Sequence, residues 1–174
     1  GYKGLGGKTG RTIAIWLKTT KTNGDLISWG ANGNGSQWTI CLNSGAARLD
    51  VGAGHIQAST PLDDGNWHHI AIERYQNGEL ILYIDGVAQD QTGLLPLSAS
   101  IDNNHPILIG SKHFNLYHSC LIREAMISSS NRYYENFIPA LGFLNDTNTL
   151  GLWKINAGSG DILYDHSGNG NHGT

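Results

Sequence analysis

The sequence predicts an all-β sandwich, on the basis of its strand periodicity, its turn residues and its composition. Short runs with alternating apolar side chains recur along the 174 residues, and clusters of Gly, Asn and Asp separate them. The chain has 24 glycines and only 14% charged residues, which favours short strands and tight turns over helices. Because a chain of this length fits one domain with one sizeable core, we expect residues 1–174 to form a single domain.

The first strand is predicted by period-two alternation. Within residues 11–19, Ile13, Ile15 and Leu17 share one face, whereas Ala14 and Trp16 share the other. Comparable runs follow, each bounded by turn residues. We expect these further strands at residues 26–30, 37–42, 48–51 and 57–59.

A central hairpin is the clearest local signal. Residues 67–75 place Ile70 and Ile72 on one face, and residues 80–84 alternate in the same way. The segment Gln76-Asn77-Gly78 lies between the two strands, and Asn and Gly accept positive φ at low cost. Asp85-Gly86 is a second turn of the same kind, which ends the hairpin.

The last third of the chain predicts fewer elements. Strands are expected at residues 105–110 and 119–128, and the only helical turn that we expect covers residues 131–137. The apolar pair Leu152-Trp153 indicates one more strand near the C-terminus.

Charge and hydropathy exclude two classes of partner. The formal charge is −3 and no run of Lys or Arg occurs, so the chain lacks the basic footprint that binds nucleic acid. No apolar run approaches the roughly 20 residues that a membrane-spanning helix needs, and we expect no membrane insertion.

Several motifs resemble laminin G-like domains of the concanavalin A-like lectin superfamily. The segment Thr12–Lys18 is similar to the opening T-x-x-x-W-x-K strand of those domains, and residues 64–72, 107–110 and 122–127 are similar to later strands. The resemblance implies a two-sheet antiparallel jelly roll, usually extracellular, that works in adhesion or glycan binding and often carries calcium. It therefore implies a glycan or another cell-surface or matrix component as the partner.

The chain departs from the family pattern at two places. Arg123 stands where relatives commonly have Asp, which removes any metal ligand at that position. A Leu-Trp strand followed by an Asp-x-Ser-Gly-Asn segment commonly opens such domains, whereas here it lies near the C-terminus. Residues 143–174 thus have three interpretations: closure of their own sandwich, the start of a truncated second repeat, or insertion into the open edge of a neighbouring chain. The last would make the protein a homo-oligomer or the structural subunit of an extracellular filament.

The sequence gives no support for catalysis. Glycosidases need two carboxyl groups facing each other across the sugar, yet Glu124 has no acidic partner in its strand, and Glu73 and Asp85 lie on separate strands. We expect these three to be solvated outward residues. Adjacent residues of a strand point to opposite faces, so His68 and His69 cannot both bind one metal ion. We expect a protein that is not an enzyme.

Calcium is the one cofactor that the sequence suggests. Asp165, Asn169 and Asn171 place oxygen-bearing side chains along a glycine-rich segment, as a hard cation with six to eight oxygen ligands requires. The alternative is a tight turn in which these side chains bond their own backbone.

Glycan binding requires exposed aromatic faces with polar groups around them. By alternation the outward candidates are Trp16, His69 and Tyr83, and the segment Arg132-Tyr133-Tyr134 offers Tyr133 and Tyr134 as a second patch near a rim. The alternative for each ring is packing in the core.

Two cysteines, Cys41 and Cys120, lie in strand-like segments far apart in the sequence. They are candidates for a disulfide, and the alternative is a pair of small buried thiols.

Overall fold

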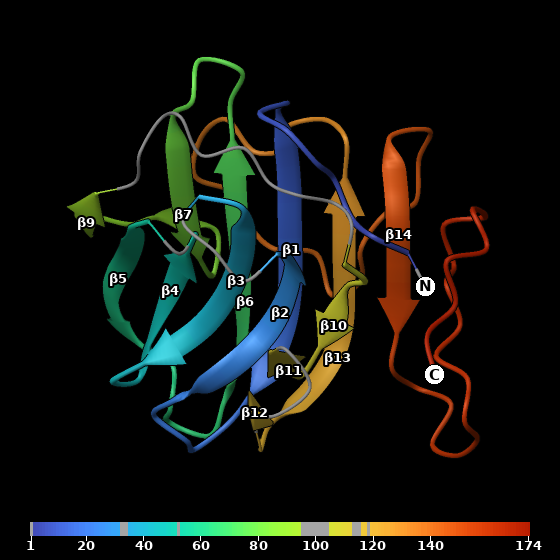
Figure 1. The fold of residues 1–174 in the computed structure, drawn as a ribbon. Helices are drawn as coiled ribbons and strands as arrows, with labels where there is room; N and C mark the ends of the chain where they lie inside the picture. The colour runs from blue at the N-terminus through green and yellow to red at the C-terminus, as the bar shows by residue number, and fades with distance from the viewer. Residues whose placement is uncertain (1, 32–34, 52, 95–104, 113–115, 118) are drawn as a thin grey trace.

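The structure is a computed structural model of the chain and describes residues 2–31, 35–51, 53–94, 105–112, 116–117 and 119–174. Its strands form two antiparallel six-stranded sheets that pack face to face, which confirms the predicted sandwich (Figure 1). No helix forms in the described residues. The expected helical turn at residues 131–137 is therefore wrong, and this segment is irregular.

The first sheet contains, in spatial order, β14 (Thr149–Lys154), β13 (Leu121–Ser128), β1 (Arg11–Lys18), β6 (Trp67–Arg74), β7 (Leu80–Ile84) and β8 (Val87–Ala88). The second contains β10 (Leu108–Ile109), β2 (Gly24–Gly30), β3 (Gln37–Asn43), β4 (Ala46–Asp50), β5 (His55–Pro61) and β9 (Gln91–Leu94). A two-stranded sheet joins β11 (Ser111–Lys112) and β12 (Leu116–Tyr117). The short strands β8, β9, β11 and β12 carry too few residues for alternation to predict them.

The main core lies between the two sheets and follows the predicted alternation. Ile13, Ile15 and Leu17 of β1 are fully buried in it, beside Ile70 and Ile72 of β6. The registers agree with this, because Ile13 pairs with Ile72 and Ile15 with Ile70. The main core thus uses one face of the first sheet and leaves the other face for separate packing.

The C-terminal strand β14 pairs with β13 of the same chain, so Leu152-Trp153 extends the first sheet (Figure 1). The tail, residues 155–174, then runs back beside β14. It is tied there by bridges between Trp153 and Asp165 and between Leu163 and Gly173. In this arrangement the tail covers part of the outer edge of β14.

Candidate functional site

Three of the aromatic side chains expected to bind ligand lie on the outer face of the first sheet, as alternation predicts. They are nevertheless buried: Trp16 is 8% exposed, and His69 and Tyr83 are each 1% exposed. The prediction that these rings are exposed is therefore wrong, and no sugar can stack on them in this arrangement.

The segment that buries them connects β13 to β14 and comprises residues 129–148, which we call the cover. Its inward side chains Tyr133, Phe137 and Phe143 pack on the outer face and form a second core, separate from the core between the sheets. Tyr133 and Phe137 stack in parallel, with ring centroids 3.8 Å apart. Tyr133 is half-buried, whereas Tyr134 is 72% exposed, so only Tyr134 of the second predicted patch is well exposed.

Glu73 fixes the start of the cover to the sheet. Its carboxylate is fully buried and accepts hydrogen bonds from Thr12 Oγ1 at 2.7 Å, Asn131 Nδ2 at 2.6 Å, and the backbone N–H groups of Arg132 and Tyr133 at 3.2 and 3.1 Å. Burial raises the pKa of Glu73, against the effect of these four donors. The expectation of a solvated carboxylate is wrong for Glu73, because the cover shields its carboxylate from solvent.

Glu124 makes a corresponding contact with the second half of the cover. It is buried, and its carboxylate accepts the backbone N–H of Phe143 at 2.7 Å. The expectation of a solvated side chain is wrong for Glu124 too, whereas Asp85 is exposed as expected. Both buried acids thus have backbone donors of the cover as partners.

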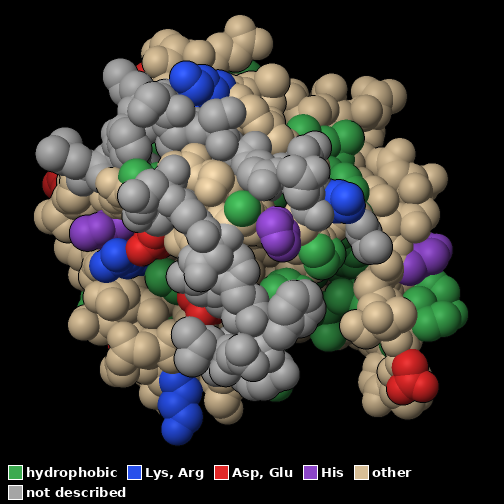
Figure 2. Space-filling view, in the orientation of Figure 1, with side chains coloured by type: hydrophobic (Ala, Val, Ile, Leu, Met, Phe, Trp, Pro, Cys, Tyr) green, Lys and Arg blue, Asp and Glu red, His purple; other side chains and the backbone are tan. Residues whose placement is uncertain are grey.

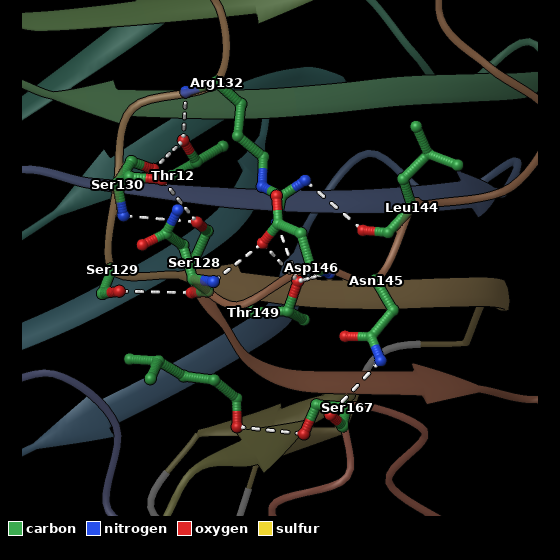
Figure 3. Close-up of polar contacts among 12 residues, drawn as sticks. Thr12, Ser128, Ser129, Ser130, Arg132, Leu144, Asn145, Asp146, Thr149 and Ser167 are labelled. Atoms are coloured by element: carbon green, nitrogen blue, oxygen red, sulfur yellow. Dashed lines mark hydrogen bonds and ion pairs between the residues drawn. The ribbon is translucent and has the colours of Figure 1, made fainter.

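A polar network joins the two ends of the cover (Figure 3). Arg132 Nη2 donates to Asp146 Oδ1 and to Thr149 Oγ1, at 2.7 Å each, and Nη1 donates to the carbonyl of Leu144 at 3.3 Å. Asn145 Nδ2 donates to the carbonyl of Ser167 in the tail at 3.2 Å. The cover and the tail are therefore connected through side chains.

The two central histidines have different environments, as adjacent strand residues should. The two ring nitrogens of His68 lie 2.8 Å from Asp85 Oδ2 and 3.0 Å from Asp64 Oδ1. Burial opposes the charge of His68, but the two carboxylates outweigh it and raise its pKa. His69 points into the second core, where burial lowers its pKa to about 4.

The expected calcium ligands bond to the protein itself. Asp165 Oδ1 accepts the N–H groups of Leu152 and Ser167, and Oδ2 accepts Ser167 Oγ and the N–H of Asn171, at 2.7–2.9 Å. These donors occupy the lone pairs that a cation would need. Asn169 and Asn171 direct their side-chain N–H groups to the carbonyl of Leu150. In this arrangement the Asp165 carboxylate is the acceptor of a hydrogen-bonded turn, and calcium binding by the three residues stays a prediction.

Cys41 and Cys120, both among the described residues, are thiols and do not form a disulfide in the structure. Cys120 packs against the main core, and burial raises its pKa to about 11. In the part of the chain that the structure describes, no group of three or more His, Cys, Asp or Glu side chains could hold a metal ion, and no helix is long and apolar enough to cross a membrane.

The site that sequence reasoning missed is a groove of about 840 Å³ between the tail and the adjacent edges of both sheets. We call it the tail groove. Figure 2 shows hydrophobic side chains on the right of the viewed face, where the tail lies in Figure 1. The apolar part of the lining includes Ile109, Ile122, Ile155, Ile162, Leu163 and Tyr164, and the polar part includes Asn156, Ser159, Asp161 and His166. Tyr164 is 53% exposed, and its ring makes a T-shaped contact with His172, with ring centroids 5.5 Å apart.

Comparison with solved structures shows the same fold. The fourth and fifth G-like domains of mouse laminin alpha1 superpose with a TM-score of 0.58 at 16% identity, over 71% of this chain and 36% of that one. The LG1-3 region of laminin alpha2 gives 0.54 at 15% identity, over 78% and 31%. The binding domain of botulinum neurotoxin serotype D gives 0.53 at 18% identity, over 75% and 34%. The matched region thus spans about a third of each of these solved chains.

No curated protein matches the chain. The family model described as the concanavalin A-like lectin/glucanases superfamily, in its laminin G-like branch, matches residues 4–132. The match includes β1 to β13 and ends within the cover, so most of the cover and the whole tail lie beyond it. Since the match includes most of the chain, the protein belongs to the laminin G-like family of the concanavalin A-like superfamily.

Proposed function

We propose that the protein is a non-catalytic, extracellular binding module that recognises a glycan of a cell surface or matrix, with the tail groove as its binding site. The observation that carries the proposal is the exposed ring of Tyr164, which lies in a groove with Asn156, Ser159 and Asp161. Sugar rings stack their C–H groups on aromatic faces and bond their hydroxyls to such polar side chains. The volume of about 840 Å³ is also in the range of ligand sites.

The fold supports a binding role by analogy. One solved structure of this fold is the binding domain of botulinum neurotoxin DC in complex with rat synaptotagmin II, with a TM-score of 0.52 at 16% identity. An extracellular location agrees with the similarity to laminin domains. The class of ligand is inferred from the residues of the tail groove and not from the family, because the tail lies outside the family match.

A glycan array tests this proposal. We expect the labelled wild-type chain to bind a restricted set of glycans, and Tyr164→Ala to lose that binding at least tenfold. The matched control is Tyr134→Ala, which removes an exposed tyrosine from the cover and should bind as the wild type does. Equal binding by Tyr164→Ala and the wild type would exclude the tail groove as the site.

The mass of the bound glycans after long incubation tests the non-catalytic part of the proposal. We expect the mass to be unchanged, because Glu73 and Glu124 both bond to the cover and neither lines the tail groove. Released sugar products would show that the chain is an enzyme. Repeating the array with a chelator tests whether binding requires calcium; we expect the same binding.

A further inference from the structure

His69 lies in a cage of aromatic rings that the cover completes. Its ring centroid is 5.3 Å from Trp16 of β1, and 6.0, 5.6 and 5.6 Å from Tyr133, Phe137 and Phe143 of the cover. All four contacts are edge-to-face. Within the described structure its Nδ1 is buried and has no hydrogen-bond partner. A neutral imidazole fits this cage, whereas a charged one loses its hydration there.

The charges around His69 do not compensate for this loss. From the turn after β7, Asp85 favours the charged form, and its Oδ1 also accepts the backbone N–H of His69 at 2.8 Å. From β13, Arg123 disfavours it, and Glu124 bonds to Phe143 instead. The residues facing it from β1 and the cover carry no charge near neutral pH. Burial is the largest effect.

The cover can leave without breaking either sheet. It contains no strand, so none of its residues belongs to a sheet ladder. Besides the bonds to Glu73 and Glu124, the N–H of Phe137 donates to the carbonyl of Gly86 at 2.9 Å, and Asn136 Oδ1 accepts the N–H of Ala88 at 2.8 Å. Further side-chain bonds run from Trp16 Nε1 to the carbonyl of Ala140, from Tyr75 Oη to the carbonyl of Tyr133 and from Asn131 Nδ2 to the carbonyl of Arg74. Thr12 Oγ1 donates to the carbonyl of Ser130 and accepts the N–H of Arg132, and Arg132 and Asn145 bond to Thr149 and Ser167 as described above. None of these bonds belongs to a sheet ladder, and the apolar attachment is the contact of three aromatic rings with the outer face.

We propose that the cover is an acid-released latch, in which protonation of His69 detaches the cover from the first sheet while the two sheets stay paired. The charged imidazole gains hydration only when the cover leaves. Acid would thereby uncover the outer face with Trp16 and Tyr83, which neutral pH keeps buried.

The sign of the effect follows from proton linkage. The pKa of His69 is about 4 under the cover and returns toward its ordinary 6.5 when the cover is open. The open state therefore binds the proton more tightly, and opening increases as the pH falls below 6.5. For these two pKa values, linkage raises the open-to-closed ratio about 20-fold from pH 7 to pH 5, and about 100-fold to pH 4.

Glu73 acts with the opposite sign. Because burial raises its pKa, the closed state binds a proton at Glu73 more tightly than the open state does. Acid therefore tightens the cover through Glu73 and loosens it through His69. Without His69 only the opposite effect of Glu73 remains. Replacing His69 should consequently abolish the opening of the cover in acid or turn it into closure.

Hydrogen exchange by mass spectrometry from pH 7 to pH 4, corrected for the intrinsic rates, measures the opening. The reporters are the amides of Arg132, Tyr133, Phe137 and Phe143, and the reference is the paired strands β1 and β6. We expect exchange of the cover to increase several-fold by pH 5 while the reference strands stay protected. Equal acceleration in β1 and β6 would indicate global unfolding and overturn the latch.

Two variants assign the effect to His69. His69→Phe keeps an aromatic ring in the cage, and His69→Gln keeps a polar neutral side chain in case the phenylalanine does not fit. Either folded variant should lose the acid rise, whereas the exposed control His166→Gln should keep it. An unchanged acid rise in a folded His69 variant would overturn the proposal.

Discussion

The ring centroids of Phe143 and His69 lie 5.6 Å apart, with 61° between the ring planes, although Phe143 belongs to the cover and His69 to β6. This contact makes the outer face of the first sheet an interior surface. The sheet is therefore buried on both sides, by the second sheet on one side and by an irregular segment on the other.

Truncating Phe143 tests the second core. Phe143 is 7% exposed, so Phe143→Ala should lower the free energy of unfolding by about 3 kcal/mol. The adjacent Leu144 is 76% exposed, and Leu144→Ala should stay within about 0.5 kcal/mol of the wild type. Denaturant unfolding measures both, and equal effects would contradict the burial described for the cover.

Gly86 permits the close approach of the cover to the turn after β7. It has a φ of 81°, and a Cβ at this position would overlap the carbonyl oxygen of Phe137. We expect Gly86→Ala to destabilise the chain by about 2–3 kcal/mol, from backbone strain and displacement of the cover. Gly168 also has a positive φ, but its Cβ would meet no atom within 4 Å, so Gly168→Ala should cost only about 1 kcal/mol. Equal losses in thermal unfolding would show that the overlap is unimportant.

Replacing Asp165 distinguishes a hydrogen-bonded turn from a calcium site. Because its carboxylate accepts four donors, Asp165→Ala should lower the free energy of unfolding by about 2 kcal/mol, in calcium and in chelator alike. Asp161→Ala in the exposed part of the tail is the control. If calcium raised the melting temperature of the wild type and Asp165→Ala abolished this rise, the result would support a calcium site at Asp165.

His68 gives a separate pH dependence. Its pKa is raised in the folded chain, so its contribution to stability is complete below the unfolded value of 6.5 and is lost as the pH rises through the folded pKa. Asp85→Asn should lower the pKa of His68, as measured by NMR titration of the imidazole, because one of its two carboxylate partners is removed. The control Asp90→Asn should leave this titration unchanged, and a shift of equal size in both would refute the assignment to Asp85.

The solution mass distinguishes closure of the chain's own sheet from strand donation. Since β14 pairs with β13 of the same chain and the tail bridges back onto it, we expect a monomer whose mass by light scattering is independent of concentration. A mass that rises with concentration, and falls when residues 149–174 are deleted, would support the structural subunit instead.

Sequence patterns predicted the main strands because alternation records which face of a strand each side chain takes. They correctly placed Trp16, His69 and Tyr83 on the outer face. The exposure of these side chains is a different property, because it depends on which segment packs on the outer face. The cover has no periodic pattern from which this packing could be predicted. Four aromatic residues within residues 133–143 were the only available signal.

The tail groove and the Asp165 turn could not be predicted for a related reason. The lining of the groove combines Ile109, Ile122 and Tyr164, which come from separate segments and meet only in the folded chain. A row of Asp and Asn side chains suits both a cation and a turn. The choice depends on which donors face Asp165, and those include Leu152 from another element.

The long connection between β13 and β14 also bears on the order in which the chain assembles. Closing a connection of about 20 residues costs about 1.2 kcal/mol more in chain entropy than closing a five-residue loop. The pair β6–β7, joined by residues 75–79, is the local counterpart and has the lower entropic barrier. We therefore expect β14 to dock late, onto a sheet already nucleated by the β6–β7 hairpin. During synthesis the edge of β13 would remain open until β14 emerges, and in that interval it could mispair with another nascent chain.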